Sequence, residues 1–157
     1  MGKRADTNVD EPQSPAESSW FHGEVAYEGL PLFLRFPAQP DVDKLSELWP
    51  WLLVVTHRLE HVTDRGLPTA DYNDSLIDFD EALVRGLSKK GQGTTVLVET
   101  FDCLRSYYFY ARDEATIDEF EKEIVKRFPE HQLEWFRKPD PNWKLFRDYS
   151  TDFNFYP

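Results

Sequence analysis

The stretch LRSYYFYARD, residues 104–113, decides the fold that the sequence predicts. It follows TTVLVETFD, residues 94–102, and only Cys103 separates the two runs. Both runs are rich in the β-branched and aromatic residues that favour strands, and the break between them leaves room only for a tight turn. We therefore expect a β-hairpin over residues 94–112.

Side chains alternate between the two faces of a strand, so the second run of this hairpin has two sets. The set expected to meet the helices consists of Leu104, Tyr108 and Tyr110. The set expected to look the other way consists of Arg105, Tyr107 and Phe109. A face with two such rings is unusual in water, so a cover is predicted, either from the terminal segments of the chain or from a partner.

An amphipathic helix is expected on each side of the hairpin in the sequence. The first has apolar residues at helical spacing, and Gly91 follows it as a C-cap. Its buried stripe consists of Leu76, Phe79, Leu83 and Leu87. The second helix begins after Asp113, a candidate N-cap. Its buried stripe consists of Ile117, Phe120, Ile124 and Phe128.

Strands are also expected at both ends of this region, at residues 51–62 (WLLVVTHRLEHV) and at residues 132–137. The order from residue 51 onward is then strand, helix, strand, strand, helix, strand. That order is typical of an α+β fold with a ferredoxin-like βαββαβ sheet, in which both helices cover one face. The ferredoxin-like core spans about residues 51–138.

Before this core, EVAYEGLPLFLRF at residues 24–36 predicts an N-terminal β-hairpin that turns at Glu28 and Gly29. A chain of 157 residues suits one core, so residues 20–157 are expected to form a single α+β domain. Residues 1–19 have almost no apolar side chains, and we expect a disordered acidic tail there.

The chain has a formal net charge of −11. A surface of that sign repels phosphate backbones and anionic lipids, so direct binding to nucleic acid is not expected, whereas a basic protein partner would be attracted. Cys103 is the sole cysteine, and no secretion signal opens the sequence. The longest apolar run, residues 49–55, is too short to cross a bilayer. These features predict a cytoplasmic protein without a membrane segment; they leave its oligomeric state open.

His57 and His61 stand in the pattern H-x-x-E-H, which matches an inverted zinc-protease motif. In a helix the two imidazoles would lie one turn apart and could share one Zn²⁺. In a strand their Cα atoms would lie about 13 Å apart, at about 3.3 Å per residue, too far for one metal. The strand-forming run before His57 favours two partly exposed strand histidines and no metal site.

Glu99 and Arg105 flank the hairpin turn and are predicted to pair across the ladder. No two acids have a spacing that singles out a general acid and base, so no catalytic residue is assigned and no cofactor is expected. Asp140-Pro141-Asn142-Trp143 predicts a turn that delivers Trp143 to the core. The candidate binding residues are His57, Glu99, Arg105, Tyr107, Phe109 and Trp143.

Three motifs together resemble the bacterial domain-of-unknown-function family 695. They are Gly66-Leu67-Pro68 before an acidic helix, the strand at residues 105–110 followed by Arg112-Asp113, and Asp140-Pro141-Asn142-Trp143. The likeness covers most of residues 24–149 and implies no reaction. The family is more distantly similar to the regulator of ribonuclease activity B, a small acidic ferredoxin-like protein that binds and inhibits an RNA-degrading endonuclease. That similarity implies a protein-binding role and a strand at residues 57–61.

We therefore expect a non-enzymatic protein-binding or regulatory module. Association steered by its acidic surface would weaken as salt is added. Two alternatives stay open at this point. One is a small hydrolase or metal-dependent enzyme with a site near His57, Glu99 and Arg105. The other is an immunity-type inhibitor of a toxin, which shares the profile of a small acidic domain.

Overall fold

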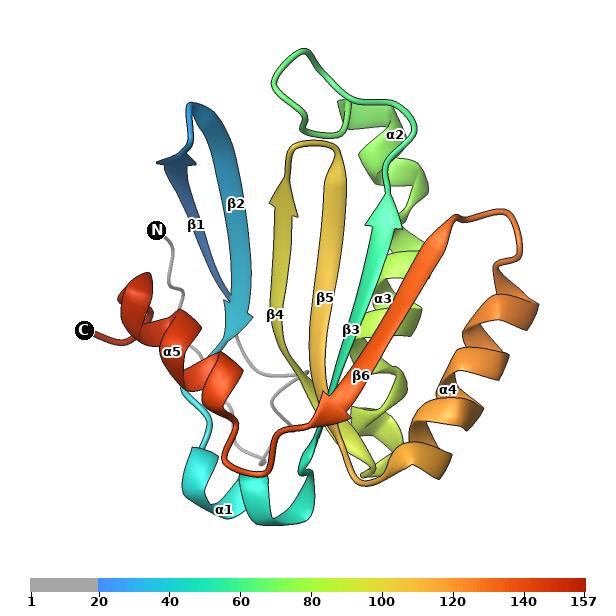
Figure 1. The fold of residues 1–157 in the computed structure, drawn as a ribbon. Coiled ribbons are helices and arrows are strands. Elements are labelled where there is room, and N and C mark those ends of the chain that lie inside the picture. Colours follow the sequence, from blue (N-terminus) through green and yellow to red (C-terminus); the bar gives the residue numbers. More distant parts are fainter. Residues whose placement is uncertain (1–19) are drawn as a thin grey trace, which may run out of the picture.

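The computed structural model describes residues 20–157, so the predicted tail at residues 1–19 lies outside the described residues. Within residues 20–157 the chain forms six strands and five α-helices (Figure 1). The strands are β1 (Trp20–Tyr27), β2 (Leu30–Pro37), β3 (Trp51–Arg58), β4 (Gly93–Phe101), β5 (Leu104–Ala111) and β6 (Leu133–Pro139). The helices are α1 (Val42–Leu48), α2 (Ala70–Ser75), α3 (Ile77–Gly86), α4 (Glu114–Arg127) and α5 (Lys144–Asp152).

All six strands belong to one antiparallel sheet, in the order β1-β2-β4-β5-β3-β6. The α+β class is thereby confirmed, with a sheet wider than the four-stranded one expected. The predicted N-terminal hairpin exists and turns at Glu28 and Gly29, both with positive φ. It does not precede a separate core, because β2 pairs with β4 and extends the same sheet.

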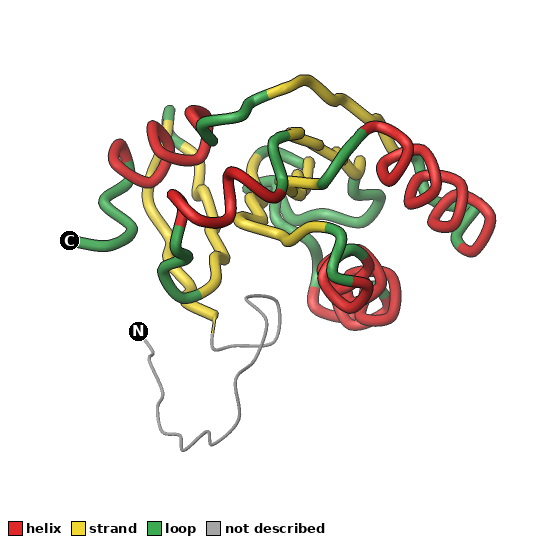
Figure 2. The backbone as a smooth tube through the Cα atoms, turned by 90° about the horizontal axis from the view of Figure 1, so that it is seen from below, coloured by secondary structure: helices red, strands yellow, loops and turns green. Residues whose placement is uncertain are grey.

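The two predicted helices cover one face of the sheet, and α5 lies against the other (Figures 1 and 2). The predicted caps are correct: Asp113 accepts a hydrogen bond from the Thr116 amide at 2.8 Å. Gly91 adopts the left-handed conformation behind a 3₁₀ turn, Ser88–Lys90, that follows α3. The predicted apolar stripes supply six of the thirteen buried residues of the helix-side core, and strands β3, β4 and β5 supply most of the others.

The predicted orientation of β5 is wrong. Tyr107 and Phe109 face the helices and are fully buried, whereas Tyr108 and Tyr110 face α5. Alternation defines two sets of side chains but cannot say which set meets the helices when both sets are aromatic. The turn before β5 also takes two residues, Asp102 and Cys103, both with positive φ, rather than Cys103 alone.

The C-terminal segment covers the face of the sheet opposite α3 and α4, as predicted. The N-terminal hairpin, expected to share in this cover, is instead part of the sheet. Trp143 stacks on Tyr110, with ring centroids 4.2 Å apart, and its Nε1 donates to the Trp49 carbonyl at 2.7 Å. Farther along the chain, Phe155 stacks on Phe36 of β2 at 3.9 Å. The predicted role of the Asp140–Trp143 turn, to deliver Trp143 to the core, is confirmed.

Asp140 fixes the start of α5. Its carboxylate accepts a hydrogen bond from Tyr110 Oη at 2.7 Å and others from the amides of Lys144 and Leu145 at 2.9 and 3.1 Å. Burial opposes ionisation of this carboxyl, but these donors outweigh burial and hold its pKa below the usual value. The motif residues Asp140 and Trp143 are therefore structural parts of the second core.

Candidate functional site

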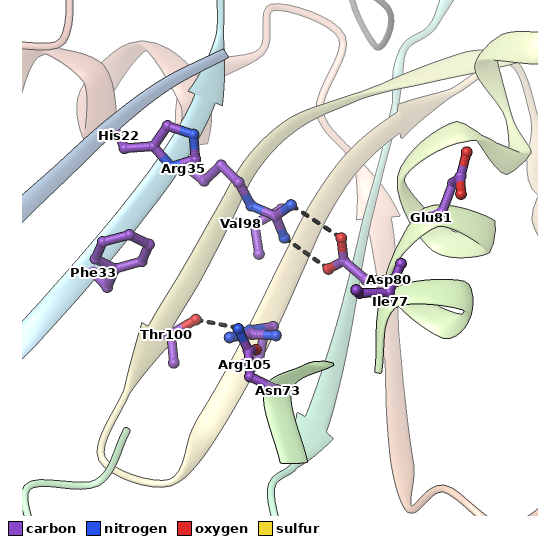
Figure 3. Close-up of a pocket in the computed structure, with 10 residues that line it drawn as sticks. All are labelled: His22, Phe33, Arg35, Asn73, Ile77, Asp80, Glu81, Val98, Thr100 and Arg105. Carbon is purple, nitrogen blue, oxygen red and sulfur yellow. Dashed lines mark hydrogen bonds and ion pairs between the residues drawn. The ribbon is translucent and has the colours of Figure 1, made fainter. Parts of the chain in front are cut away.

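A cavity of about 420 Å³ lies on the helix-covered face, between the β1–β2 hairpin and helices α2 and α3 (Figure 3). The cavity forms because β1 and β2 extend the sheet past the area that α3 covers. Phe33, Val98 and Ile77 supply apolar walls, and the charged groups inside it are described below.

The strand register explains why distant residues meet in this cavity. Side chains opposite one another on neighbouring antiparallel strands share a face. One row runs across four strands through Phe33, Thr100, Arg105 and His57. The next row runs through His22, Arg35, Val98 and Tyr107. Both rows face α3, so one side of the sheet presents two arginines to the same space.

Arg35 is neutralised by a carboxylate of α3. Its Nη1 and Nη2 donate to the two Asp80 oxygens at 3.0 and 2.7 Å, and Tyr107 Oη donates to Asp80 Oδ1 at 2.7 Å. Burial would raise the pKa of Asp80, but the bonds from Arg35 and Tyr107 outweigh it and lower that pKa. Burial and the neighbouring Asp80 raise the pKa of Tyr107 well above its usual value. Asp80 is thus a fixed anion with its oxygens engaged.

Arg105 has a different environment. Its Nε donates to Thr100 Oγ1 at 2.9 Å, and the residue is only 8% exposed. Within residues 20–157, no carboxylate forms an ion pair with it. A guanidinium is charged at every physiological pH and has a fork of donors suited to an oxyanion. The cavity therefore holds two cations, of which one forms no ion pair in the described chain, although its charge also acts on the Asp80 carboxylate.

His57 lies beside Arg105 in the same row and is 1% exposed. Neither of its ring nitrogens has a hydrogen-bond partner in the described part of the chain. The rings of Phe79 and His131 each lie 4.9 Å away, centroid to centroid. Burial, then the charges of His131 and Arg105, lower the pKa of His57 to about 4, so it is neutral at pH 7.

The zinc-protease pattern has no helix to support it. His57 belongs to β3, which ends at Arg58, and His61 lies in the loop that follows. The prediction of two partly exposed strand histidines is also wrong, because His57 is buried and the strand stops before His61. Over residues 20–157 no group of three or more His, Cys, Asp or Glu side chains is arranged to hold a metal ion.

The predicted pairing of Glu99 with Arg105 is wrong, since the two side chains lie on opposite faces of the sheet. Glu99 is opposite Ser106, on the face of α5, and accepts hydrogen bonds from Tyr108 Oη at 3.2 Å and Tyr149 Oη at 2.5 Å. Arg105 is opposite Thr100. Two carboxylates, Glu99 and Asp140, therefore bind tyrosine hydroxyls beneath α5, far from the arginine row.

The six candidate binding residues divide between the two faces. His57, Arg105 and Tyr107 share the cavity side, and Tyr107 reaches the cavity through Asp80. Phe109 lies in the helix-side core against Phe120, with ring centroids 5.5 Å apart. The remaining two, Glu99 and Trp143, serve the opposite core.

Of the ten residues that line the cavity, sequence reasoning found only Arg105; the missed residues include Arg35, Asp80 and Thr100. Arg35 is a lone cation within the apolar run LPLFLRF, a signal that was present in the sequence. Asp80 lies four residues after the buried Leu76 and three before Leu83, so it borders the apolar stripe of its helix. Each alone resembles an ordinary surface charge, and only the fold brings them together.

Among residues 20–157, no helix combines the length and the apolar character needed to cross a membrane. No match was found among curated proteins or among solved structures. The model of a family of unknown function, DUF695, matches residues 34–150, which include the second half of β2, the cavity residues from Arg35 onward and the Asp140–Trp143 turn. The chain therefore belongs to the DUF695 family.

Proposed function

We propose that this protein is a non-enzymatic binding module and that its cavity receives an oxyanion, a carboxylate or a phosphate group, of the partner that it binds. The observation that carries this proposal is the buried guanidinium of Arg105, held by Thr100 and without an ion-pair partner in the described chain.

A buried charge is costly unless it is paired and hydrogen-bonded. Thr100 fixes the Nε edge of Arg105 and leaves the terminal nitrogens to meet a ligand. The hydroxyl of Thr100 accepts this bond, so its own proton is free to be donated to the same oxyanion. An oxyanion at this position would gain charge-assisted hydrogen bonds from a donor group already held in place.

The surroundings of the cavity favour a protein as the source of that oxyanion. The chain has a net charge of −11, so free anions are repelled from most of its surface. A basic protein surface would be attracted, and could present a carboxylate, from a side chain or a chain end, or a phosphorylated residue. Phe33 and Val98 then offer apolar contacts to the atoms that carry the anion.

The Asp80 carboxylate supports binding more than catalysis. The other carboxylate of the lining, Glu81, accepts a hydrogen bond from Arg85 at 3.2 Å. A general base needs an available oxygen and a pKa near the working pH. Asp80 has neither property, because Arg35 and Tyr107 engage its oxygens and its pKa is lowered. His57 is a neutral imidazole, but it is enclosed by rings. We therefore favour the binding module over the hydrolase.

The proposal can be tested by NMR, with the Nε–Hε signal of Arg105 as the probe in wild type and the backbone amide signals of Phe33 and Thr100, which line the same cavity, as the probe in wild type and in every variant. The full chain would be titrated with inorganic phosphate, with acetate, and with a basic peptide that has either a free or an amidated C-terminus. Affinities for the small ions are expected in the millimolar range, about 4 kcal/mol. The two ions and the two peptides distinguish phosphate from carboxylate as the preferred group.

The matched variants are Arg105→Met and Arg58→Met, which remove the same charge. Arg58 ends β3 and is exposed. Arg105→Met should weaken binding at least about tenfold, because a hydrogen bond to a charged group contributes about 1.5–3 kcal/mol. Arg58→Met should leave binding unchanged. Equal binding by wild type and Arg105→Met, or no shift of the Arg105 signal with any probe, would refute the proposal.

We further propose that residues 51–138 form a ferredoxin-like unit to which the β1–β2 hairpin is added. The order β4-β5-β3-β6, with α3 and α4 on one face, supports this. A regulatory protein contact like that of the regulator of ribonuclease activity B, in a bacterial cytoplasm, would agree with the acidic charge and the single free Cys103. Co-purification with an RNA-degrading endonuclease would test that part.

A further inference from the structure

The two edges of the sheet differ in how they are protected. The outer edge of β6 has Arg137, Lys138 and Pro139 near its end, and charged residues and proline are common devices that stop edge strands from pairing. The other edge strand, β1 (WFHGEVAY), has Glu24 as its lone formal charge and contains no proline or lysine. Its apolar side chains Val25 and Tyr27 are 40% and 45% exposed.

The outer backbone of β1 is not paired with any other part of residues 20–157. Tyr27 and Leu30 flank the two-residue turn, so they exchange hydrogen bonds within the hairpin, and alternate residues of β1 then point their backbone groups outward. The outward set comprises His22, Glu24 and Ala26. No backbone hydrogen bond from this set to the rest of residues 20–157 is formed outside the β1–β2 ladder. A row of free donors and acceptors of this length is a template for another strand.

We propose that β1 pairs antiparallel with β1 of a second copy of this chain, around a two-fold axis at Gly23. The sequence of β1 is complementary to itself in that register. His22 would lie opposite Glu24 of the partner subunit, and Phe21 opposite Val25 of the partner subunit. Each pair joins chemically matched side chains, and both members of the His22–Glu24 pair point their backbone groups outward, as the ladder requires.

Neighbouring registers are less favourable. A two-fold axis at Glu24 would place the two Glu24 carboxylates directly opposite each other, and like charges in that position are destabilising. The Gly23 register instead covers Val25 with Phe21, whose ring already packs on Phe36 with centroids 5.7 Å apart. Gly23, at the axis, has no side chain, and nothing lies within 4 Å of the position that its Cβ would occupy. The space beside the axis is therefore open.

The pairing of the two β1 strands would place a residue of the partner subunit next to the cavity but not inside it. His22 is one of the cavity walls, so Glu24 of the partner subunit would stand at the rim of each cavity. Because two edge strands bury less surface than a standard interface of about 1,600 Å², the dimer should be weak, with a Kd on the order of 100 µM.

Sedimentation velocity of the full chain, from about 10 µM to about 1 mM, would detect a dimer of that strength. The decisive variant is Glu24→Pro. Proline removes a backbone donor that points outward and is tolerated on an edge strand, so the β1–β2 ladder stays intact. The control variant is Phe136→Ser, which removes an exposed ring, 54% exposed, from the opposite edge.

The expected result is a concentration-dependent dimer for wild type and for Phe136→Ser, and a monomer at every concentration for Glu24→Pro with an unchanged melting temperature. Glu24→Lys should weaken the dimer at least about tenfold by removing the bond to His22. A wild-type chain that stays monomeric up to 1 mM, or a Glu24→Pro variant that still dimerises, would overturn the inference. Neither result depends on whether the cavity binds an oxyanion.

Discussion

Arg35 and Asp80, 45 residues apart in the sequence, form a two-point ion pair, with Nη1–Oδ2 at 3.0 Å and Nη2–Oδ1 at 2.7 Å. The pair ties the N-terminal hairpin to α3 across the cavity (Figure 3). Trp20 adds to the clasp, because its ring lies 5.8 Å from the Arg35 guanidinium carbon. The cavity is therefore bounded by a contact that can be broken by one substitution.

Replacing Asp80 with Asn should lower the free energy of unfolding by about 2–3 kcal/mol, since it leaves Arg35 partly buried without its counter-charge. Urea denaturation at pH 7 measures the change. Glu123→Gln is the matched control, because it removes a carboxylate from an exposed pair with Lys90. That control should cost less than about 0.5 kcal/mol. A loss in Asp80→Asn no larger than in the control would show that the clasp contributes nothing.

The same pair should make wild type sensitive to acid. The pKa of Asp80 is lowered in the folded state, so its contribution is present above its unfolded pKa, near 3.8, and is lost as the pH falls through the lower folded value. The stability difference between wild type and Asp80→Asn should therefore shrink below about pH 4. Denaturation series at pH 3 and pH 7 test this, and a constant difference would contradict it.

Gly66→Ala should be more destabilising than Gly29→Ala. Both glycines have positive φ, +81° and +84°, so alanine is strained at either position by about 1 kcal/mol. A Cβ on Gly66 would also lie 2.8 Å from the Asp102 Cα, whereas nothing lies within 4 Å at Gly29. We expect an additional loss of about 1–3 kcal/mol at Gly66, measured as the difference between two urea transitions. Equal losses would mean that this loop moves away freely.

His57 should make stability fall as the solution is acidified. Its pKa is about 4 in the folded chain against 6.5 for the free group, so between these values the unfolded chain binds the proton and the folded chain does not. Stability then falls by up to about 1.4 kcal/mol per pH unit from pH 6.5 down to pH 4. Arg105 and His131 face the same imidazole and oppose its protonation.

The comparison of wild type with His57→Phe isolates this effect. The variant should lose less stability than wild type over the same pH range, and the difference between the two curves should stop changing below about pH 4. His61→Phe removes a histidine from the exposed loop and should leave the wild-type slope unchanged. Parallel curves for wild type and His57→Phe would contradict the buried, neutral state of His57.

Tyr149→Phe should loosen α5 more than Tyr108→Phe does. Both hydroxyls donate to Glu99 of β4, but Tyr149 lies on α5 and ties the helix to the sheet, whereas Tyr108 lies on β5 and its bond stays within the sheet. A loss of about 1–2 kcal/mol is expected for Tyr149→Phe. Amide hydrogen exchange of α5 measures it locally. Equal protection in both variants would show that Glu99 does not anchor the helix.

Most helices, strands and turns could be predicted from the sequence because the patterns that indicate them are local. The stripe of α4, the cap at Asp113 and the turn at Glu28-Gly29 each depend on residues within a few positions of one another. The face of β5 could not be predicted, since rings alternate on both sides of that strand and the C-terminal segment makes the second face a core as well. The pairing of β2 with β4 likewise joins residues far apart in the sequence, and no local pattern predicts it.

The candidate site was predicted only in part, for a similar reason. Arg105 is a cation inside an aromatic strand and was predicted as a binding residue; it lines the cavity. The predicted pairing of Glu99 with Arg105 is one residue out of register, because the two-residue turn Asp102-Cys103 places Glu99 opposite Ser106. Arg35 and Asp80 meet only through the sheet order, so their relationship became visible with the fold.

The stack of Phe36 on Phe155 sets an order of events during synthesis. Tyr156, next to this stack, donates to the Pro37 carbonyl across 119 residues of chain. The side of β2 that packs on Phe155 therefore stays uncovered until that later part of the chain is made. Contacts of such long range slow folding and expose the nascent chain to aggregation. A product that ends within α5 would leave the apolar side of β2 exposed. Such a truncated product should be a target for chaperones and proteases.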